Sequence, residues 1–187
     1  MKIGIYIGSF DPVHKGHIRL ARHLLKKNYV DRLLIVPTGN YWNKQDLTPS
    51  EERIKLLKLF ETKDLKIETE YNELPYTYQL LRKLKKRYPQ DELYLVLGAD
   101  NLLKFEEWQN AREIMKYPWI ILKRKGVDIA RNMERLNKKD YTVVDDIREY
   151  DISSSYIREN MDDYEKVKDF VHKKVYDRYK RYLDKRS

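Results

Sequence analysis

The stretch GSFDPVHKGH, from Gly8 to His17, carries two histidines, His14 and His17, at a spacing of three residues. It follows an apolar run and opens a pattern of helical spacing, so both imidazoles point the same way on a first helical turn. Gly8 and Ser9 permit a tight turn before that helix, and a helix start presents unpaired backbone amides that favour anions. The two imidazoles could therefore hold the phosphates of a triphosphate and stabilise charge that moves to a leaving pyrophosphate.

Other phosphate and metal sites do not fit this stretch. A Walker loop requires Gly-Lys-Ser/Thr, and a dinucleotide-binding turn requires three glycines at G-x-G-x-x-G; neither is present. A zinc site requires a third ligand, and the remaining histidines, His23 and His172, show no ligand spacing. For the pair taken alone, exposed histidines on a capped helix remain the alternative.

Short apolar runs alternate along the chain with patterns of helical spacing. Several runs are apolar on both faces, which is typical of a parallel sheet that helices cover on both sides. The predicted strands are Lys2 to Gly8, Leu33 to Val36, Leu65 to Thr69, Leu93 to Leu97, Trp119 to Leu122 and Tyr141 to Val144. The predicted fold class is therefore α/β, a doubly wound parallel sheet with helices on both faces.

Two helices are predicted in the first third of the chain. One runs from Lys15 to about Asn28, where its apolar spacing stops. The other begins at a capping box, with Thr48 as N-cap, Pro49 in the first position and Glu51 in the third. Both helices follow predicted strands and are expected to pack back on the sheet.

Helical patterns continue in the rest of the chain. Thr77 is expected to cap a helix that runs through Tyr88 and that Pro89 stops. Helical spacing returns before Met115, and it dominates a C-terminal segment at about residues 153–185. We expect one domain over residues 1–187 with this helical segment at its end.

The ends of the predicted strands bring several polar segments to one edge of the sheet. Ligands of parallel sheets bind at the carboxyl ends of the strands. The segments that follow strands are GSFDP, the loop 37–47, GAD at Gly98 to Asp100, Lys123 with Arg124, and the ISSS segment. This edge is the predicted site.

The composition limits the remaining classes. The 39 basic and 30 acidic side chains give a net charge of +9, but the two signs are interleaved along helical patterns, as on a solvated surface. Nucleic-acid binding is therefore not expected as the main function. The chain has no cysteine for disulfides, no leading signal segment and no run of about 18 apolar residues for a membrane span. We expect a cytoplasmic protein that does not bind membranes.

Two motifs resemble those of one superfamily. GSFDPVHKGH is similar to G-x-F-[DN]-P-x-H-x-G-H, the signature of the adenylyl- and cytidylyltransferases, which have a Rossmann-like core. ISSSYIR, from Ile152 to Arg158, resembles the I-S-S-[ST]-x-I-R element that binds ATP phosphates in these nucleotidyltransferases. A serine run before a helix is otherwise an ordinary N-cap. The pair of motifs implies adenylyl transfer from ATP.

The middle of the chain narrows the resemblance. The segment LPYTYQLLRKLKKRYPQDELYLVLGADNLLKFEEW resembles the bacterial nicotinate (or nicotinamide) mononucleotide adenylyltransferases of NAD biosynthesis, and the similarity covers nearly the whole chain. It implies that Tyr76 and Thr77 lie near the nicotinate ring and Asp100 near the adenosine ribose. It also implies that Trp108 stacks on the ring, since an indole offers a flat face to a pyridinium. Core packing remains the alternative for this tryptophan.

The resemblance implies a role for each site residue. Catalysis is assigned to His14, His17, Lys44 and Arg158. ATP binding is assigned to Gly8, Ser9, Phe10, His14, His17, Gly98, Asp100, Arg124, Ser154, Ser155 and Arg158. Acceptor binding is assigned to Lys44, Tyr76, Thr77 and Trp108. No protein metal site is expected, and Mg²⁺ should bridge the triphosphate oxygens.

Two departures from the family pattern concern the acceptor. Tyr41, Trp42 and Asn43 replace two prolines and a histidine before Lys44, and Gln79 with Leu80 replaces Asp-Thr. Both changes are expected near the nucleotide acceptor, so nicotinamide mononucleotide or phosphopantetheine remains an alternative to nicotinate mononucleotide. A non-catalytic nucleotide- or nucleic-acid-binding module is the alternative from another class. The oligomeric state and the preference for acid or amide stay open at this stage.

Overall fold

A parallel sheet forms the centre of the computed structural model, which describes residues 1–40, 46–147 and 153–186. In the described residues the sheet has six strands. Their bounds are β1 Lys2–Gly8, β2 Arg32–Pro37, β3 Leu65–Ile67, β4 Glu92–Gly98, β5 Trp119–Leu122 and β6 Tyr141–Val144. The predicted α/β class is confirmed, and each predicted strand agrees with an observed one to within two residues at either end.

The strand order is β3-β2-β1-β4-β5-β6, and every neighbouring pair is parallel. Gly8 pairs in register with Pro37 of β2, and Tyr6 pairs with Val96 of β4. The chain moves from β1 to one side of the sheet and later returns to place β4 on the other side. The carboxyl ends of β1 and β4 therefore flank the switch point, where doubly wound sheets bind ligands.

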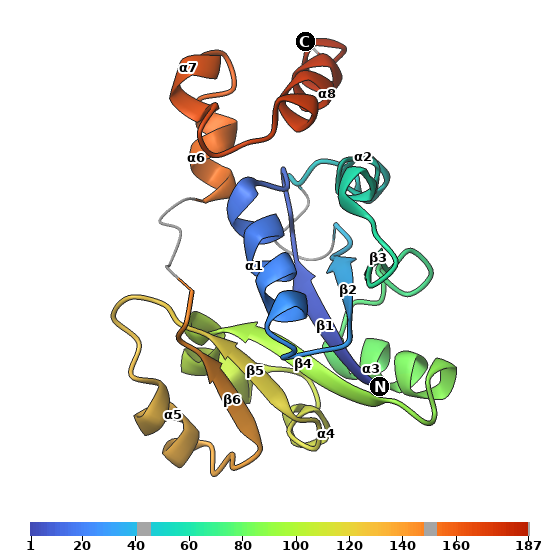
Figure 1. Ribbon diagram of the computed structural model, residues 1–187, viewed down its shortest axis with the longest axis vertical. Helices are drawn as coiled ribbons and strands as arrows, with labels where there is room; N and C mark the ends of the chain where they lie inside the picture. Colours follow the sequence, from blue (N-terminus) through green and yellow to red (C-terminus); the bar gives the residue numbers. More distant parts are fainter. Residues whose placement is uncertain (41–45, 148–152, 187) are drawn as a thin grey trace.

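Helices cover both faces of the sheet. Their bounds are α1 Lys15–Lys26, α2 Ser50–Leu57, η2 Lys58–Phe60, α3 Thr77–Arg87, η3 Ala99–Glu107, α4 Ala111–Ile114, α5 Ile129–Arg135, α6 Ser154–Glu159, α7 Tyr164–Val167 and α8 Lys173–Asp184. One buried cluster joins α1, α2 and the C-terminal helices to one face, and a second joins α3, η3, α4 and α5 to the other. Figure 1 shows α6, α7 and α8 grouped beside the N-terminal end of α1.

Alternation of side chains explains why one strand serves both clusters. Ile5 of β1 belongs to the α3 side, whereas its neighbour Tyr6 belongs to the α1 side. Successive residues of a strand point to opposite faces, so a strand that is covered on both faces must be apolar throughout. This is the physical reason that the short apolar runs predicted the strands well.

Two predicted helix starts were wrong. The N-cap of α2 is Pro49 and not Thr48, and Pro49 makes no side-chain capping bond. The Thr48 hydroxyl instead bonds the hydroxyl of Tyr179 in α8, at 3.1 Å. Thr77 is the first residue of α3, and Tyr76 is the N-cap. Thr48 does not cap the helix because its hydroxyl, which would accept a backbone amide in a capping box, is hydrogen-bonded to Tyr179 near the C-terminus.

The last third of the chain is more broken than its helical spacing predicted. The C-terminal segment forms three helices, and two of them start at side chains that cap the helix: Ser153 accepts from Tyr156 N and Asp163 from Glu165 N. Helix α5 was not predicted, although Asp128 accepts from the Arg131 amide as an N-cap. In the described parts of the chain, no helix has the length and hydropathy of a membrane span.

Candidate active site

A cavity of about 470 Å³ lies at the switch point of the sheet. Gly8 and Ser9 at the end of β1 and Gly98 at the end of β4 form part of its wall. Tyr76 and Thr77 at the start of α3 also line it, as do two residues beyond η3, Trp108 and Gln109. The structure thus brings Tyr76, Thr77 and Trp108 of the predicted acceptor-binding set next to predicted ATP-binding residues at the ends of two central strands. The edge of the sheet that the sequence indicated holds a real cavity.

His14 and His17 form a reciprocal cap at the start of α1. The His17 amide donates to His14 Nδ1 at 3.4 Å, and the His14 amide donates to His17 Nδ1 at 3.3 Å. The two rings are stacked, with centroids 3.6 Å apart. Because each Nδ1 accepts a hydrogen bond, each neutral ring carries its proton on Nε2. The expected proximity of the two rings is confirmed, although His14 is the N-cap and not part of the first helical turn, and the pair offers two Nε2–H donors.

Both imidazoles are held in the neutral form. Burial, and to a smaller extent the positive charge of Arg124, lower the pKa of His14 to about 4. Burial, His14 and Arg124 together place the pKa of His17 well below its usual value. Near neutral pH the pair therefore acts on an anion through hydrogen bonds from Nε2 and not through positive charge. The charge at this place comes from Arg124.

Acid is expected to destabilise the chain through His14. The unfolded chain has a His14 pKa near 6.5 and the folded chain one of about 4, so the unfolded state binds more protons between these values. The free energy of unfolding therefore falls as the pH drops from about 6.5 towards 4, by up to about 3 kcal/mol from this group. Denaturant titrations at about pH 7 and about pH 4.5 measure this loss.

The variant His14→Asn isolates this effect. Asparagine keeps a side-chain oxygen that can accept the His17 amide, but it does not titrate. The variant should lose less stability than the parent between the two pH values, because carboxylates titrate equally in both proteins. The same loss in both proteins would show that His14 does not carry this pH dependence.

The turn before α1 has a tightly packed backbone. Phe10 has a positive φ of 49°, and its ring is buried edge-on against His17, with centroids 4.9 Å apart. A Cβ on Gly8 would lie 2.9 Å from the Phe10 ring, so a larger residue does not fit there without a shift. The Phe10 side chain thus shapes the turn from the core side. Because this ring is buried, Phe10 can contact ATP only through its backbone, which agrees with its predicted role in ATP binding.

Arg53 holds the loops beside the cavity, and the sequence analysis missed it. Its side chain is fully buried, and its Nε donates to the carbonyl of Thr48 at 2.7 Å. Its terminal nitrogens donate to the carbonyls of Ser9 at 2.6 Å and Thr38 at 2.5 Å, and to the side chain of Asn40 at 3.0 Å. One guanidinium therefore joins the turn after β1 to both ends of the loop after β2. A charged residue inside an ordinary amphipathic pattern gave no signal of this role.

Asp11 joins the same turn to the C-terminal helices. It is 1% exposed, and its carboxylate accepts from the Thr48 amide at 3.0 Å and from the Tyr179 hydroxyl at 3.2 Å. Burial raises the pKa of Tyr179 to about 12, and the negative charge of Asp11 contributes. Asp11, the aspartate of the signature, therefore has a structural role, because it binds Thr48 and Tyr179. Helix α8 is tied to the turn through Tyr179.

The second motif packs on the first. Ser153 caps α6, and the Ser154 hydroxyl donates to the Pro12 carbonyl at 3.0 Å. Arg158 donates to the carbonyl of Asp11 at 2.5 Å and to the Ser155 hydroxyl at 3.1 Å. The expected neighbourhood of the two motifs is confirmed. Ser155 and Arg158 are exposed, so they are accessible to a ligand.

Asp100 and Arg124 lie next to each other at the ends of β4 and β5. Their carboxylate and guanidinium are 3.6 Å apart, and both side chains are largely exposed. A Cβ on Gly98 would lie only 2.5 Å from the Asp100 carboxylate, so this position requires glycine as long as Asp100 keeps its place. The charge of Arg124 acts on both histidines, as their pKa shifts show.

The cavity has a neutral lining. Among the described residues that line it, none is Lys, Arg, Asp or Glu. Three polar residues of this wall, Thr38, Asn101 and Gln109, were not predicted from the sequence. The Thr38 hydroxyl is buried without a hydrogen-bond partner, and Asn101 donates to the Gly98 carbonyl at 3.1 Å. Asn101 and Gln109 each directly follow a predicted site residue, which is the one signal that could have found them.

Trp108 is half-buried at this wall, with its ring centroid 5.3 Å from that of Phe105. It therefore packs on the core and lines the cavity at the same time, and its stacking on the nicotinate ring stays a prediction. Trp119, in contrast, is fully buried in β5.

The two departures from the family pattern have different outcomes. Lys44 and the segment 41–43 lie outside the described residues, so the predicted role of Lys44 stays a prediction. Leu80 is buried in the core below α3, and Gln79 lines a different cavity together with Arg82 and Tyr117. Neither Gln79 nor Leu80 is among the described residues that line the cavity beside Tyr76 and Thr77, and a place for them near the acceptor stays a prediction.

Comparisons with known proteins agree with this geometry. The cytidylyltransferase-like family model matches residues 5–160. A probable nicotinate-nucleotide adenylyltransferase of Endomicrobium trichonymphae is 36% identical over 185 residues, which cover 94% of each chain. One from Clostridium novyi is 32% identical and covers 93% of this chain and 94% of the relative.

Solved structures share the fold. Plasmodium falciparum nicotinic acid mononucleotide adenylyltransferase, complexed with NaAD, superposes with a TM-score of 0.81. The two chains are 22% identical, and the match covers 97% of this chain and 95% of the other. At this identity the likeness establishes the Rossmann-like architecture, including the helical segment at the C-terminus.

Proposed function

Because the chain belongs to the cytidylyltransferase-like family and, within it, to the nicotinate-nucleotide adenylyltransferases, we propose that it transfers AMP from ATP to nicotinate mononucleotide. The products would be nicotinate adenine dinucleotide and pyrophosphate, as a step of NAD biosynthesis. The observation that carries the proposal is the position of the capped histidine pair. The pair follows the turn on which the α6 motif docks, and Gly8 and Ser9 before this turn line the cavity together with Trp108.

The transfer needs no covalent intermediate on the protein. A 5′-phosphate oxygen of the acceptor attacks the α-phosphorus of ATP, and the bond from that phosphorus to the bridging oxygen breaks as pyrophosphate leaves. In such transfers the protein mainly aligns the reactants and stabilises the charge on the phosphate oxygens. Each residue therefore acts as a donor or a cation at a defined place.

The ATP side uses the two motifs. His14 and His17 donate from Nε2 to the α- and β-phosphates, where charge develops. Arg124, Ser155 and Arg158 bind the outer phosphates, together with Lys44 from the loop after β2. Ser154 keeps α6 on the turn through its bond to Pro12. Backbone groups of Gly8 to Phe10 and Gly98 position the nucleotide, and Asp100 binds the ribose.

The acceptor side uses the neutral wall. The pyridinium ring stacks on Trp108, which attracts a cation by its ring face. Tyr76 and Thr77 border the ring. Since no charged side chain among the described residues lines this cavity, the nicotinate carboxylate would meet hydroxyl, amide and backbone groups. We extend the same assignment to Gln109, which follows Trp108 on this wall.

Magnesium belongs to this proposal as a companion of ATP. Among the residues that the structure describes, no three His, Cys, Asp or Glu side chains gather in a metal-binding cluster. The donors of the site are imidazoles, guanidinium groups and hydroxyls, which fit phosphate oxygens better than a metal ion. Mg²⁺ is usually held by substrate phosphates with few protein ligands, and when bound it would neutralise part of the triphosphate charge.

The test is pyrophosphate release from ATP and Mg²⁺ with one acceptor at a time. We expect kcat/KM for nicotinate mononucleotide to exceed that for nicotinamide mononucleotide by about tenfold or more. Phosphopantetheine should give no release above the background without acceptor. A preference for phosphopantetheine would overturn the proposed substrate. Absence of release with all three acceptors would indicate a nucleotide-binding module without catalysis.

A further inference from the structure

A stripe of cations runs along one side of α1. Lys15, Arg19, Arg22 and Lys26 follow one another at steps of four, three and four residues, which places them on the same helix face. Over this length an α-helix rises about 16 Å. Arg19, Arg22 and Lys26 are exposed, whereas Ala21 and Leu24 of the same helix are buried against the sheet. The stripe therefore faces away from the core.

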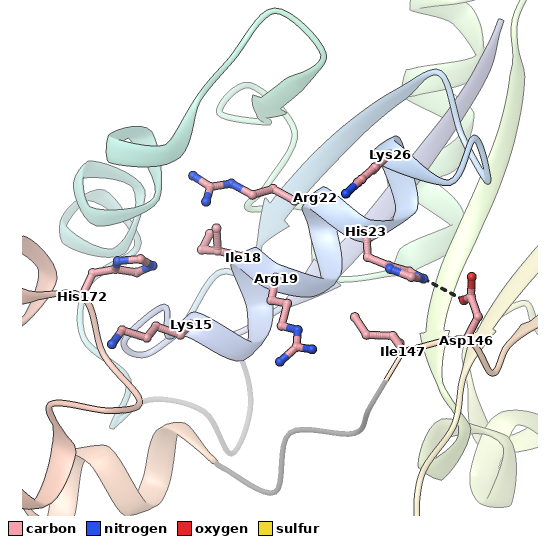
Figure 2. Close-up of a pocket in the computed structure, with 9 residues that line it drawn as sticks. All are labelled: Lys15, Ile18, Arg19, Arg22, His23, Lys26, Asp146, Ile147 and His172. Carbon is pink, nitrogen blue, oxygen red and sulfur yellow. Dashed lines mark hydrogen bonds and ion pairs between the residues drawn. The ribbon is translucent and has the colours of Figure 1, made fainter.

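This stripe lines a groove that other parts of the chain complete. The groove has a volume of about 460 Å³, and Asp146 and Ile147 after β6 line it together with His172 before α8. Figure 2 shows α1 between these two segments, with His172 near Lys15 at one end and Asp146 near His23 at the other. Ile18 and Ile147 provide an apolar part of the wall. Three segments far apart in sequence thus form one concave site.

The groove has a strong excess of positive charge. Four side chains of the stripe carry permanent charge, and Asp146 is the one carboxylate among the described residues that line the groove. That carboxylate is engaged by His23 at 2.7 Å and by the Tyr29 hydroxyl at 3.0 Å. Lys15 donates to the Lys168 carbonyl at 2.9 Å, which orients its amine but leaves its charge. The lowered pKa of His172, due to burial and then to Lys15 and Arg22, agrees with a positive potential here.

We propose that this groove binds a multivalent phosphate anion of the size of a nucleoside polyphosphate, at a second site apart from the catalytic cavity. The two cavities share no lining residue. Arginine binds phosphate through a planar fork, and Arg19 and Arg22 lie one turn apart. The volume is in the range of small-molecule sites, about 300–1,000 Å³. A concave site with an apolar wall suits a compact nucleotide better than an extended nucleic acid, which the interleaved surface charge does not favour.

Backbone amide signals of the whole chain test this site by NMR. We titrate the protein with ATP and, separately, with inorganic tripolyphosphate, and follow the amides of Arg19 to Lys26 and of Ile147. These signals should shift and saturate with their own dissociation constant, separate from that of Ser9 and Gly98 in the catalytic cavity. Shifts with both ligands would show that phosphate alone suffices, and shifts with ATP alone would show that the base is needed; either result supports the site.

A matched pair of variants makes the test specific. The double variant Arg22→Gln, Lys26→Gln should weaken binding at the α1 signals by about tenfold or more. The control Lys63→Gln, Lys66→Gln removes the same net charge from exposed positions around β3 and should leave this binding unchanged. If both double variants weakened ligand binding equally, the effect would be due to net charge alone, and the proposed site would be wrong.

Two further results would contradict the proposal. The first is the absence of shifts in α1 and Ile147 at millimolar ligand. The second is tighter binding of a short single-stranded RNA than of ATP at these signals, which would assign the groove to nucleic acid. Neither result depends on the catalytic activity, so this experiment tests the groove on α1 separately from the proposed function.

Discussion

Replacing His17 with alanine is expected to lower turnover by about 10²–10³-fold while the chain stays folded. His17 carries its proton on Nε2, because its Nδ1 accepts the His14 amide, and this Nε2–H is the proposed donor to the phosphates. The ring is neutral, so its contribution is an oriented hydrogen bond to charge that grows in the transition state. A donor of this kind affects kcat more than the affinity for ATP.

The same substitution also removes one half of the reciprocal cap. The His14 amide loses its acceptor, which should lower the free energy of unfolding by about 1 kcal/mol. His17→Gln separates the two effects, because glutamine at this helix position can accept the His14 amide but cannot place a donor where Nε2 lies. This variant should keep most of the stability and still lose turnover.

Steady-state release of pyrophosphate and denaturant titration measure the two effects side by side. Lys27→Ala, at an exposed position at the other end of α1, is the control and should change neither quantity appreciably. A folded His17→Ala protein with turnover close to that of the parent would exclude His17 from the mechanism. A loss of turnover in His17→Ala alone, with full turnover in His17→Gln, would assign the residue to helix capping only.

Replacing Arg53 with methionine should lower the free energy of unfolding by about 3–5 kcal/mol. Methionine fills a similar space, but it leaves the carbonyls of Ser9, Thr38 and Thr48 without the donors that they have now. Each buried carbonyl without a partner costs about 1–3 kcal/mol. Because Ser9 and Thr38 line the cavity, KM values should rise as well.

Denaturant titration of Arg53→Met tests the loss of stability, and Arg131→Met serves as the control from an exposed arginine of α5. Arg53→Lys should fall between the parent and Arg53→Met, since an ammonium can satisfy some but not all of the carbonyls. The network would be unimportant for stability if Arg53→Met unfolded within about 1 kcal/mol of the parent. If stability fell but KM stayed constant, the loops beside the cavity would not depend on this clamp.

The sheet and its functional edge were largely predictable from the sequence. A strand covered on both faces must be apolar at every position, so LYLVL and WIIL predict strands with little competition from helical patterns. The histidine pair was predictable because two residues three apart on a helix start are neighbours whatever the rest of the fold does. The proximity of ISSSYIR to GSFDP followed from the position of both segments after predicted strands, and the bonds of Ser154 and Arg158 to the turn confirm it.

The polar supports of the site were not predictable in this way. Thr48 is followed by Pro49 and Glu51, as in a capping box, yet its hydroxyl is taken by Tyr179. Arg53 occupies a helical position like that of any surface arginine, yet it is fully buried among carbonyls. In both cases the deciding partner lies far away in the chain, and local propensity contains no information about it.

The sequence by itself therefore determined the α/β class, the edge of the sheet at which the cavity lies, and the pair of motifs that indicate the family. Only the tertiary structure decided the protonation of the histidines, since burial and Arg124 set their pKa values. It also decided that Thr38, Asn101 and Gln109 line the cavity, whereas Gln79 lines another cavity and Leu80 is buried in the core. The physical reason is that periodicity and capping act within a few residues, whereas burial and electrostatics depend on groups that folding brings together from all parts of the chain.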